Sequence, residues 1–510
     1  MVTTKVKLFI GLMVFITLLS TPLSVEAQEN VLYSTIDRAK EMRDAGDYEQ
    51  AAEVLKKLDN QNPGNIWVQR LYAETLIWLK DYEEATLVYE KAIKMHPDDM
   101  DVKYEFATFL FNLGEYERAQ ELLLIYTQKN TRVAKAEKLL GTTYYYLGDF
   151  LPAVEHLEKS LELNPNDKNT LQLLDEVSRI TKPWIGVGFA YRNDSQNITQ
   201  LFPAIEGGLY KSSWFSPSFY LNAQNFSVDS TDNNQINFGV RNSFLFSKIG
   251  LSAKFGVGVN YASSIDSVYL LWDLALQQSL SDNLIISAKA ERSAYTYTIS
   301  SVKKPINSDK YNLFVEWKKQ KSLWVNIGYL AEVFPDANNI QTAYIWALSP
   351  SMSFSIFELR LGYSFSYANS KESRYVTVKS KQDIINDFSE DEAIEGVYNP
   401  YYTPNKEFTN SVLGNLLLKP NSNLDIRLHA TVGIYSRTMN PYFYLDTNNA
   451  GQTIIKQDFF QESYTPMDLG IKINYGLSNA LDLVISYKYF QSFYFNSNNI
   501  QLGLKLRFNK

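Results

Sequence analysis

Four turns of one kind recur in the chain at a fixed interval of 34 residues, and this spacing constrains the fold more than any other feature. The turns are Gly46-Asp47-Tyr48, Lys80-Asp81-Tyr82, Gly114-Glu115-Tyr116 and Gly148-Asp149-Phe150. A period of this length is typical of stacked units that bury their apolar faces only against their neighbours. After Pro183 the helical period stops, and alternating apolar and polar segments continue to the C-terminus. The sequence therefore predicts a helical repeat stack followed by a long series of strands.

Other residue types keep the same register as the turns. Small residues recur in the first helix of each repeat, at Ala39, Ala73, Ala107 and Gly141, and in the second helix, at Ala51, Ala85, Ala119 and Ala153. Pro63, Pro97 and Pro165 end three of the repeats, and Thr131 replaces the remaining proline. This pattern resembles the tetratricopeptide repeat, which has two antiparallel helices per unit. Residues 28–181 are predicted to form this domain, with a last helix over about 168–180 as its cap.

The first 27 residues have the features of a secretory signal peptide. Lys5 and Lys7 precede an apolar run from Leu8 to Leu19, and small residues before Gln28 offer a cleavage site. The alternative is a signal anchor, but a membrane helix needs about 20 apolar residues. Because no other segment is long and apolar enough, any membrane span must be a β-barrel. The net charge of −7 gives no reason to expect nucleic acid as a partner, and a chain without cysteine has no thiolate metal site.

The period is two from residue 182 to residue 510. In the last segment Ile500, Leu502 and Leu504 alternate with Gln501 and Gly503. A soluble sandwich and a membrane barrel both produce such strands, and the lengths of the connections decide between them. Tight turns alternate with longer loops, of which two are very long, residues 371–406 and 438–463. This asymmetry is typical of outer-membrane barrels.

Sixteen strands are expected. They are predicted to begin near Trp184, Thr199, Trp214, Gln235, Ile249, Tyr269, Leu284, Asp309, Leu323, Gln341, Ser355, Phe408, Leu424, Tyr464, Leu481 and Asn499. Since the number is even, both ends of the barrel lie on the short-turn, periplasmic side, where the repeats must also be. The linker, Ile180 to Pro183, is too short to carry the repeats away from the mouth of the barrel.

Aromatic residues are expected at the two membrane interfaces. By alternation, Trp272, Trp317, Tyr487, Tyr489, Phe493 and Phe495 are predicted to face lipid. The C-terminal segment from Gln501 to Phe508 resembles the signal that barrel-assembly machinery recognises, although Asn509 and Lys510 follow the aromatic residue.

Repeats followed directly by a barrel resemble the YaiO-type outer-membrane proteins. The layout is also similar to that of the larger porins that export poly-N-acetylglucosamine or cellulose. The resemblance implies a polysaccharide conduit whose repeats receive a periplasmic protein. This chain has far fewer repeats than those porins.

Two sets of residues are candidates for function. The concave groove of the repeats is predicted to include Trp67, Arg70, Tyr104, Phe111, Lys138 and Tyr145, although these aromatic residues could instead pack between helices. The lumen is predicted to be lined by Arg241, Lys254, Lys289, Glu291, Glu358, Arg360, Asp425, Arg427, His429, Lys472, Lys488, Lys505 and Arg507, together with Asp273, Glu316, Lys318, Asp468 and Asp482. These charges could form a selectivity ring, or a web of ion pairs in a barrel that conducts nothing.

Other features favour no cofactor, no metal and no enzyme. The acidic loop with Asp383, Asp387, Glu390, Asp391, Glu392 and Glu395 does not have calcium-loop spacing, so a solvated surface is favoured over a Ca²⁺ site. Two motifs, Asn399-Pro400-Tyr401-Tyr402 and Asn440-Pro441-Tyr442-Phe443, could stack on sugars, but mutual packing of the loops is favoured. His429 has Asp425 as a possible carboxylate partner, but no motif places a nucleophilic serine beside it.

The functional hypothesis is an outer-membrane barrel with a periplasmic tetratricopeptide adaptor. The adaptor would dock a periplasmic protein, and the barrel would export or anchor an envelope polysaccharide. The alternative is a non-conducting scaffold, in which the barrel is an anchor and the repeats recruit periplasmic proteins.

Overall fold

A computed structural model describes residues 31–228, 231–319, 322–389 and 392–508. The predicted signal peptide and the expected turn at residues 320–321 lie outside them. The chain divides into two compact units. One contains the residues up to Tyr146 and Glu155–Leu171, and the other contains Leu147–Val154 and Gln172–Lys510. Among the described helices, none combines the length and the apolar character that a membrane crossing requires.

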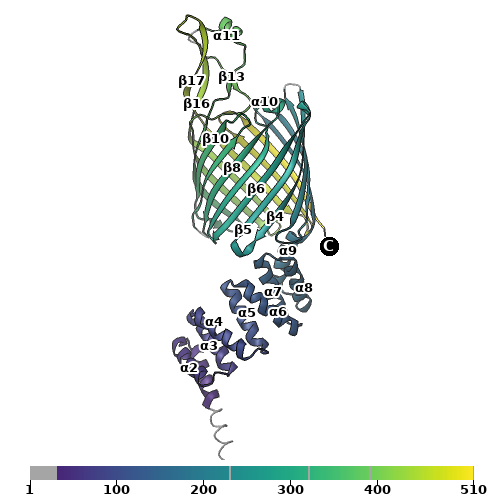
Figure 1. The fold of residues 1–510 in the computed structure, drawn as a ribbon, viewed down its shortest axis with the longest axis vertical. Helices are drawn as coiled ribbons and strands as arrows, with labels where there is room; N and C mark the ends of the chain where they lie inside the picture. The colour runs from purple at the N-terminus through teal and green to yellow at the C-terminus, as the bar shows by residue number, and fades with distance from the viewer. Residues whose placement is uncertain (1–30, 229–230, 320–321, 390–391, 509–510) are drawn as a thin grey trace, which may run out of the picture. The chain divides into compact units, whose positions relative to one another are not determined.

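The helices repeat with the period of the turns (Figure 1). The first occupies residues 31–44. The others are α2 (Tyr48–Gln61), α3 (Ile66–Leu79), α4 (Tyr82–Met95), α5 (Met100–Leu113), α6 (Tyr116–Lys129), α7 (Ala134–Leu147), α8 (Phe150–Leu163) and α9 (Lys168–Thr181). Each of these eight has 14 residues, and α2, α4, α6 and α8 begin at the aromatic residue of a turn. The tetratricopeptide architecture is confirmed.

Backbone geometry explains the first residue of each turn. Gly46, Lys80, Gly114 and Gly148 all have positive φ, between 63° and 91°. This left-handed conformation ends the preceding helix, and glycine adopts it at no steric cost. The recurrent alanines of both helices are buried, so that neighbouring helices approach closely, and Ala73 and Ala85 are fully inaccessible.

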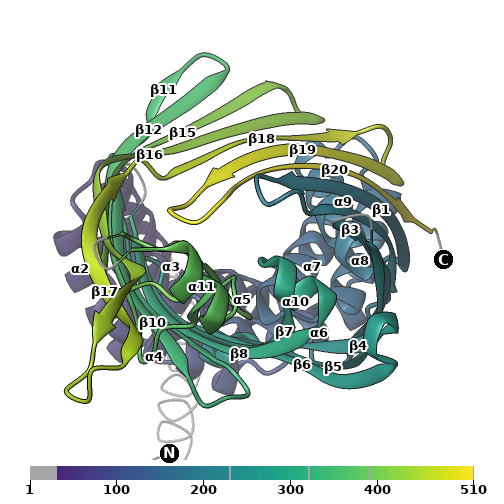
Figure 2. The ribbon, with the colours of Figure 1, turned by 90° about the horizontal axis from the view of Figure 1, so that it is seen from above.

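The second unit is a sheet closed on itself. Its wall consists of β1 (Trp184–Asp194), β2 (Thr199–Gly208), β3 (Ser216–Val228), β4 (Thr231–Phe246), β5 (Leu251–Ala262), β6 (Ser267–Ser281), β7 (Leu284–Tyr295), β8 (Ile306–Lys318), β9 (Trp324–Val333), β10 (Asn339–Leu348), β12 (Phe357–Ser370), β15 (Glu407–Asn421), β16 (Leu424–Thr447), β18 (Met467–Gly476), β19 (Leu481–Gln491) and β20 (Asn496–Arg507). Each strand pairs antiparallel with the next, and β20 pairs with β1, from Trp184 opposite Arg507 to Asp194 opposite Ser497. Figure 2 shows the strands following one another around a ring.

Sixteen strands therefore form the wall, as predicted. The sheet contains 18 strands, but β11 (Met352–Phe354) pairs only with the start of β12, and β17 (Thr453–Tyr464) pairs only with the far part of β16. The predicted starting points lie within four residues of the observed ones. We name the two ends of the barrel by their connections. The short-turn end carries the β2–β3, β4–β5 and β6–β7 turns, and the long-loop end carries residues 371–406.

Residues 438–463 are not a loop, and this prediction was wrong. The strand β16 continues to Thr447 and forms a hairpin with β17, with Asn440 opposite Phe460. Residues 371–406 do form a long connection, which contains β13 (Tyr375–Thr377), α11 (Lys381–Asp387) and β14 (Gly396–Tyr398). A short helix, α10 (Ile299–Lys303), lies in the β7–β8 connection.

The two faces of the wall differ in chemistry. On the outer face Val187, Phe189 and Leu502 are about half exposed, and the row continues with apolar residues on the other strands. On the inner face large and small residues fit together. A Cβ atom on Gly239 would lie 2.4 Å from the ring of Tyr220, so that only glycine leaves room for this tyrosine. The apolar exterior and polar interior are those of an outer-membrane barrel.

One expected lipid-facing residue lies on the other side. Phe495 contacts Tyr297 and Phe490 in a cavity that Lys488 and Asn499 also line. The strand β19 ends at Gln491, so alternation no longer determines the direction of the side chains that follow.

Candidate functional site

A groove of about 740 Å³ lies within the repeat unit. Three of the six predicted groove residues line it: Trp67, Arg70 and Tyr104. Trp67 is 60% exposed, which is unusual for an indole ring in a helical stack. Tyr82 and Tyr89 from α4 also line the groove, although the prediction considered only the first helix of each repeat.

Charges in the groove are paired with one another. The guanidinium of Arg70 donates to both carboxylate oxygens of Glu105, with Nε 2.9 Å from Oε2, and it lies 5.2 Å from the ring centre of Trp67. The hydrogen bonds that the carboxylate of Glu105 accepts raise the pKa of Arg70. Arg43 forms an ion pair with Glu74 in the same groove. The groove therefore combines a fixed cation with an exposed indole ring.

The other three predicted groove residues lie elsewhere. Phe111 packs edge-on against Tyr116 and Tyr146, and Tyr145 contacts Tyr146. The ammonium of Lys138 lies 2.9 Å from Asp167. For Phe111 the alternative of packing between helices describes the structure better, since its two partners lie on α6 and α7. The sequence could not distinguish Phe111 and Tyr145 from Tyr104, because all three are aromatic residues on the first helix of a repeat.

The pairing of the strands places the predicted lumenal charges on one face of the wall. Cross-strand partners share a face, and successive pairs link these residues around the wall. Several are already paired. Arg241 lies 2.9 Å from Asp273, Arg427 lies 3.1 Å from Asp425, and Arg507 lies 2.7 Å from Asp482.

The remaining predicted lumenal residues have other surroundings. Lys505, Lys318 and Arg360 lie over the indole rings of Trp184, Trp324 and Trp324, respectively. Five other predicted lumenal residues are described by the residue directly opposite on a neighbouring strand. These cross-strand pairs are Glu291 with Lys310, Glu316 with Asn326, Glu358 with Leu417, Lys472 with Arg427, and Lys254 with Ala275. That they line a path for a solute stays a prediction.

His429 has a carboxylate partner, but not the predicted one. Its Nε2 lies 3.0 Å from Oδ1 of Asp468, and Lys488 lies 2.9 Å from the same carboxylate. Asp425 instead accepts hydrogen bonds from Asn474 and Arg427. Since antiparallel pairing places His429 opposite Gly470, the neighbouring strand β18 supplies the carboxylate.

A cavity of about 450 Å³ lies on the inner face at the long-loop end. Arg192 lines it and is nearly buried, with its guanidinium 5.2 Å from the ring centre of Tyr297. Glu407 accepts hydrogen bonds from the hydroxyls of Tyr402 and Tyr464, both at 2.6 Å. In this cavity Tyr297 stacks on Phe495 and meets Tyr295 edge-on.

Residues 371–406 are fastened to the barrel by one side-chain cluster. The buried Tyr401 stacks on Phe334, and its hydroxyl donates to Asp336 at 2.8 Å. Arg374 donates to Asp336 at 2.7 Å. Burial and the neighbouring Asp336 raise the pKa of Tyr401 to about 12, so that the hydroxyl remains a donor at neutral pH.

The second Asn-Pro motif also packs against the loop. Phe443 is buried and stacks on Tyr375, and its backbone exchanges two hydrogen bonds with Ile394. Both motifs therefore serve loop packing in this structure.

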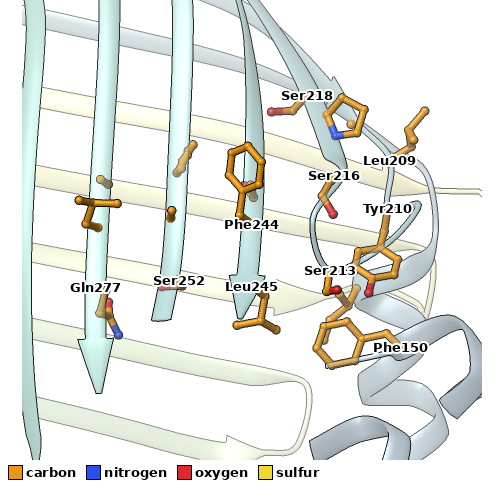
Figure 3. A pocket seen from close by; sticks show the side chains of 18 of the residues that line it. Phe150, Leu209, Tyr210, Ser213, Ser216, Ser218, Phe244, Leu245, Ser252 and Gln277 are labelled. Carbon is orange, nitrogen blue, oxygen red and sulfur yellow. The ribbon is translucent and has the colours of Figure 1, made fainter. Parts of the chain in front are cut away.

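A third cavity, of about 510 Å³, lies at the short-turn end. Figure 3 shows Ser252 and Gln277 on neighbouring strands, with Ser216 and Ser218 nearby on β3. Lys254 and Lys289 also line this cavity. In the described part of the chain no three histidine, aspartate or glutamate side chains converge as metal ligands, and Glu390 and Asp391 of the acidic loop lie outside that part.

Comparisons with known proteins support the first unit by sequence. Models of the tetratricopeptide repeat match residues 42–88, 79–141 and 134–167. No curated protein sequence matches the chain.

Three solved structures are among those that match the chain. A bacterial polysaccharide outer membrane secretin is 10% identical, with a TM-score of 0.44, over 65% of this chain and 99% of its own. MamA from Desulfovibrio magneticus RS-1 is 21% identical, with a TM-score of 0.28, over 29% of this chain and 84% of its own. Pseudomonas aeruginosa pilF is 21% identical, with a TM-score of 0.28, over 30% of this chain and 70% of its own. These scores are too low to bear on function, and the chain is a tetratricopeptide stack joined to a 16-stranded barrel.

Proposed function

We propose that the protein is an outer-membrane conduit for an envelope polysaccharide, with a periplasmic adaptor that docks a protein partner. The observation that carries the proposal is the closed barrel with an apolar outer face and a polar inner face. Such a wall is stable in lipid and offers hydrogen bonds to a solute inside.

The uncharged polar residues of the inner face suit a hydroxyl-rich polymer. They recur on many strands and include Asn222, Gln224, Asn237, Asn260, Asn326, Asn415, Ser486 and Gln501. Amide and hydroxyl groups both donate and accept hydrogen bonds, as sugar hydroxyls do. The charges between them are of both signs, and several form ion pairs with one another, so the inner face favours neither a cationic nor an anionic polymer as a whole.

The groove of the repeats is the proposed docking surface for the partner. The exposed ring of Trp67 and the guanidinium of Arg70 are adjacent, and both residue types are enriched where proteins bind tightly. We propose no catalytic role for the chain.

A second candidate is the non-conducting scaffold, and one observation favours it. Residues 371–406 are fastened at the long-loop end by Tyr401, Arg374 and Asp336, and aromatic residues pack beneath them. A connection fixed in this way would not move aside to let a polymer leave the barrel.

Single-channel conductance in planar bilayers distinguishes the two candidates. The full chain is compared with a variant that lacks residues 372–405. We expect the deletion to raise the conductance several-fold, and a neutral oligosaccharide such as maltohexaose to interrupt the current from either side. A barrel that stays closed even after the deletion would favour the scaffold and contradict export.

A further inference from the structure

One row of the inner wall carries two lysines and no carboxylate. Antiparallel pairing sets Ser243 opposite Lys254, Lys254 opposite Ala275, Ala275 opposite Lys289, and Lys289 opposite Asn312. Directly opposite residues share a face, so all five side chains lie on the inner side of β4 to β8. The two lysines are thus on alternate strands, with the smallest chiral side chain between them.

The spacing allows both ammonium groups to reach one ligand. Neighbouring strands lie about 4.8 Å apart, so the backbones of β5 and β7 are roughly 10 Å apart. A lysine side chain is flexible and long enough to cover half of this distance. Between the two lysines, Ala275 has only a methyl group, which leaves room for a ligand. Both lysines are exposed, and neither has an ion pair among the described residues, although Lys289 lies 5.4 Å from the ring centre of Phe314.

The nearest acids belong to the adjacent row, where cations already face them. Asp273 is held by Arg241 at 2.9 Å, and Glu291 lies opposite Lys310. In that row Asp273 and Glu291 lie directly opposite each other, and the ammonium of Lys310 lies 3.7 Å from Glu332 on its other side. The lysine row therefore keeps a net positive charge of its own.

The cavity around the lysines adds neutral donors. Its 510 Å³ are also lined by Ser216, Ser218, Ser252 and Ser287, and by the amide of Gln277. Ser252, Gln277 and Ser287 form the next inner-face row towards the short-turn end, two residues along each strand from the lysine row. Figure 3 shows Ser252 and Gln277 of this row on neighbouring strands. Hydroxyl and amide donors beside paired ammonium groups are the chemistry that holds oxyanions.

We propose that Lys254 and Lys289 form a binding site for an oxyanion, a phosphate or carboxylate group, inside the short-turn end of the barrel. This proposal is independent of polysaccharide export, because the site would bind an oxyanion whether the barrel is open or closed. Lysine acts as a point charge without a preferred fork geometry. The site therefore selects by charge, and both kinds of oxyanion fit it.

Calorimetric titration of the full chain in neutral detergent at low ionic strength tests the site, with pyrophosphate and with citrate as probes. We expect saturable binding of both. The double variant K254Q/K289Q should bind each probe at least tenfold more weakly. Ala275→Glu keeps both lysines but places a carboxylate between them, and it should cause a similar loss.

The control is K211Q/K419Q, which removes the same charge from the β2–β3 connection and the end of β15, outside the cavity. It should bind within twofold of the unchanged protein. The proposal is overturned if the unchanged protein shows no saturable binding, if K254Q/K289Q binds equally well, or if the control loses as much. Because the two test variants alter different strands, one remains informative if the other fails to fold. The ratio of the two affinities identifies which oxyanion the site prefers.

Discussion

At the scale of single residues, the four equivalent turns allow an internal comparison. Lys80 has φ of 63°, whereas Gly114 has φ of 83° at the same position of the next repeat. A side chain in this conformation costs about 1–2 kcal/mol, while glycine loses more entropy on folding. We expect Lys80→Gly to stabilise the repeats by about 0.5–1 kcal/mol, measured by urea unfolding of the full chain followed by tryptophan fluorescence.

The reciprocal change is the control. A Cβ atom on Gly114 would meet nothing within 4 Å, so Gly114→Lys tests backbone strain without a steric clash. It should destabilise the repeats by a similar amount. If both changes shift stability in the same direction, backbone conformation is not the cause.

Asp167 makes the repeat unit sensitive to acid. Hydrogen bonds from Lys138 and from the first turn of α9 lower the pKa of its carboxyl from 3.8 to about 2. Since the folded value is depressed, the stabilisation is complete above pH 3.8 and is lost as the pH falls towards 2. Asp167→Asn retains a cap but no charge, so its unfolding midpoint should change less between pH 4 and 2. Lys138→Gln should reduce the same dependence, and an unaltered acid profile in both variants would refute this assignment.

At the scale of elements, the repeat helices could be predicted from the sequence because each begins and ends within its own 34-residue unit. The hairpin β16–β17 could not. Asn440-Pro441 is a turn signal, yet Pro441 lies in a strand opposite Phe459. Beyond Arg437 the strand β16 no longer has β15 beside it, so a residue without an N–H group is tolerated there. The sequence alone does not show where one edge of a strand has no neighbouring strand to form hydrogen bonds with.

The long connection at residues 371–406 gives a prediction about its own local stability. Tyr401→Phe keeps the stacking of the ring on Phe334 but removes the hydroxyl group. That hydroxyl donates a hydrogen bond to Asp336 and accepts one from Arg374. Hydrogen bonds to charged groups contribute about 1.5–3 kcal/mol. We expect faster hydrogen exchange over residues 371–406, measured by mass spectrometry.

A matched control exists in the other Asn-Pro motif. Tyr442 packs against Phe460, and its hydroxyl makes no hydrogen bond to the residues that the structure describes. Tyr442→Phe should leave exchange in the connection unchanged. Equal acceleration in both variants would mean that the hydroxyl of Tyr401 does not fasten the connection.

At the scale of the whole molecule, alternation and connection lengths were enough to predict a closed barrel of 16 strands. They could not predict the partners inside it. His429 and Asp425 are four residues apart on one strand, but the partner of His429 is Asp468 on the next strand. Contacts across a sheet depend on register, which small shifts at turns and bulges determine, as between Asn410 and Ser411. The same holds for Phe111, Lys138 and Tyr145, which do not line the groove of Trp67, because a helical position determines a face but not a neighbour.

Closure of the barrel joins the first strand to the last, and the absence of cysteine makes this testable. Gly188 on β1 lies directly opposite Gly503 on β20, and a Cβ atom at either would meet no atom closer than 3.7 Å. Opposite residues in antiparallel strands are about 4.5–5.5 Å apart between Cα atoms, which a disulfide can span. The pair G188C/G503C should therefore form an internal disulfide on oxidation, seen as a faster band on a non-reducing denaturing gel. The pair G188C/L504C places one thiol on the outer face and should stay reduced, because successive residues of a strand point to opposite sides. Cross-linking of the second pair but not the first would mean that the seam closes in another register, and the inner-face assignments of either β1 or β20 would then shift by one residue.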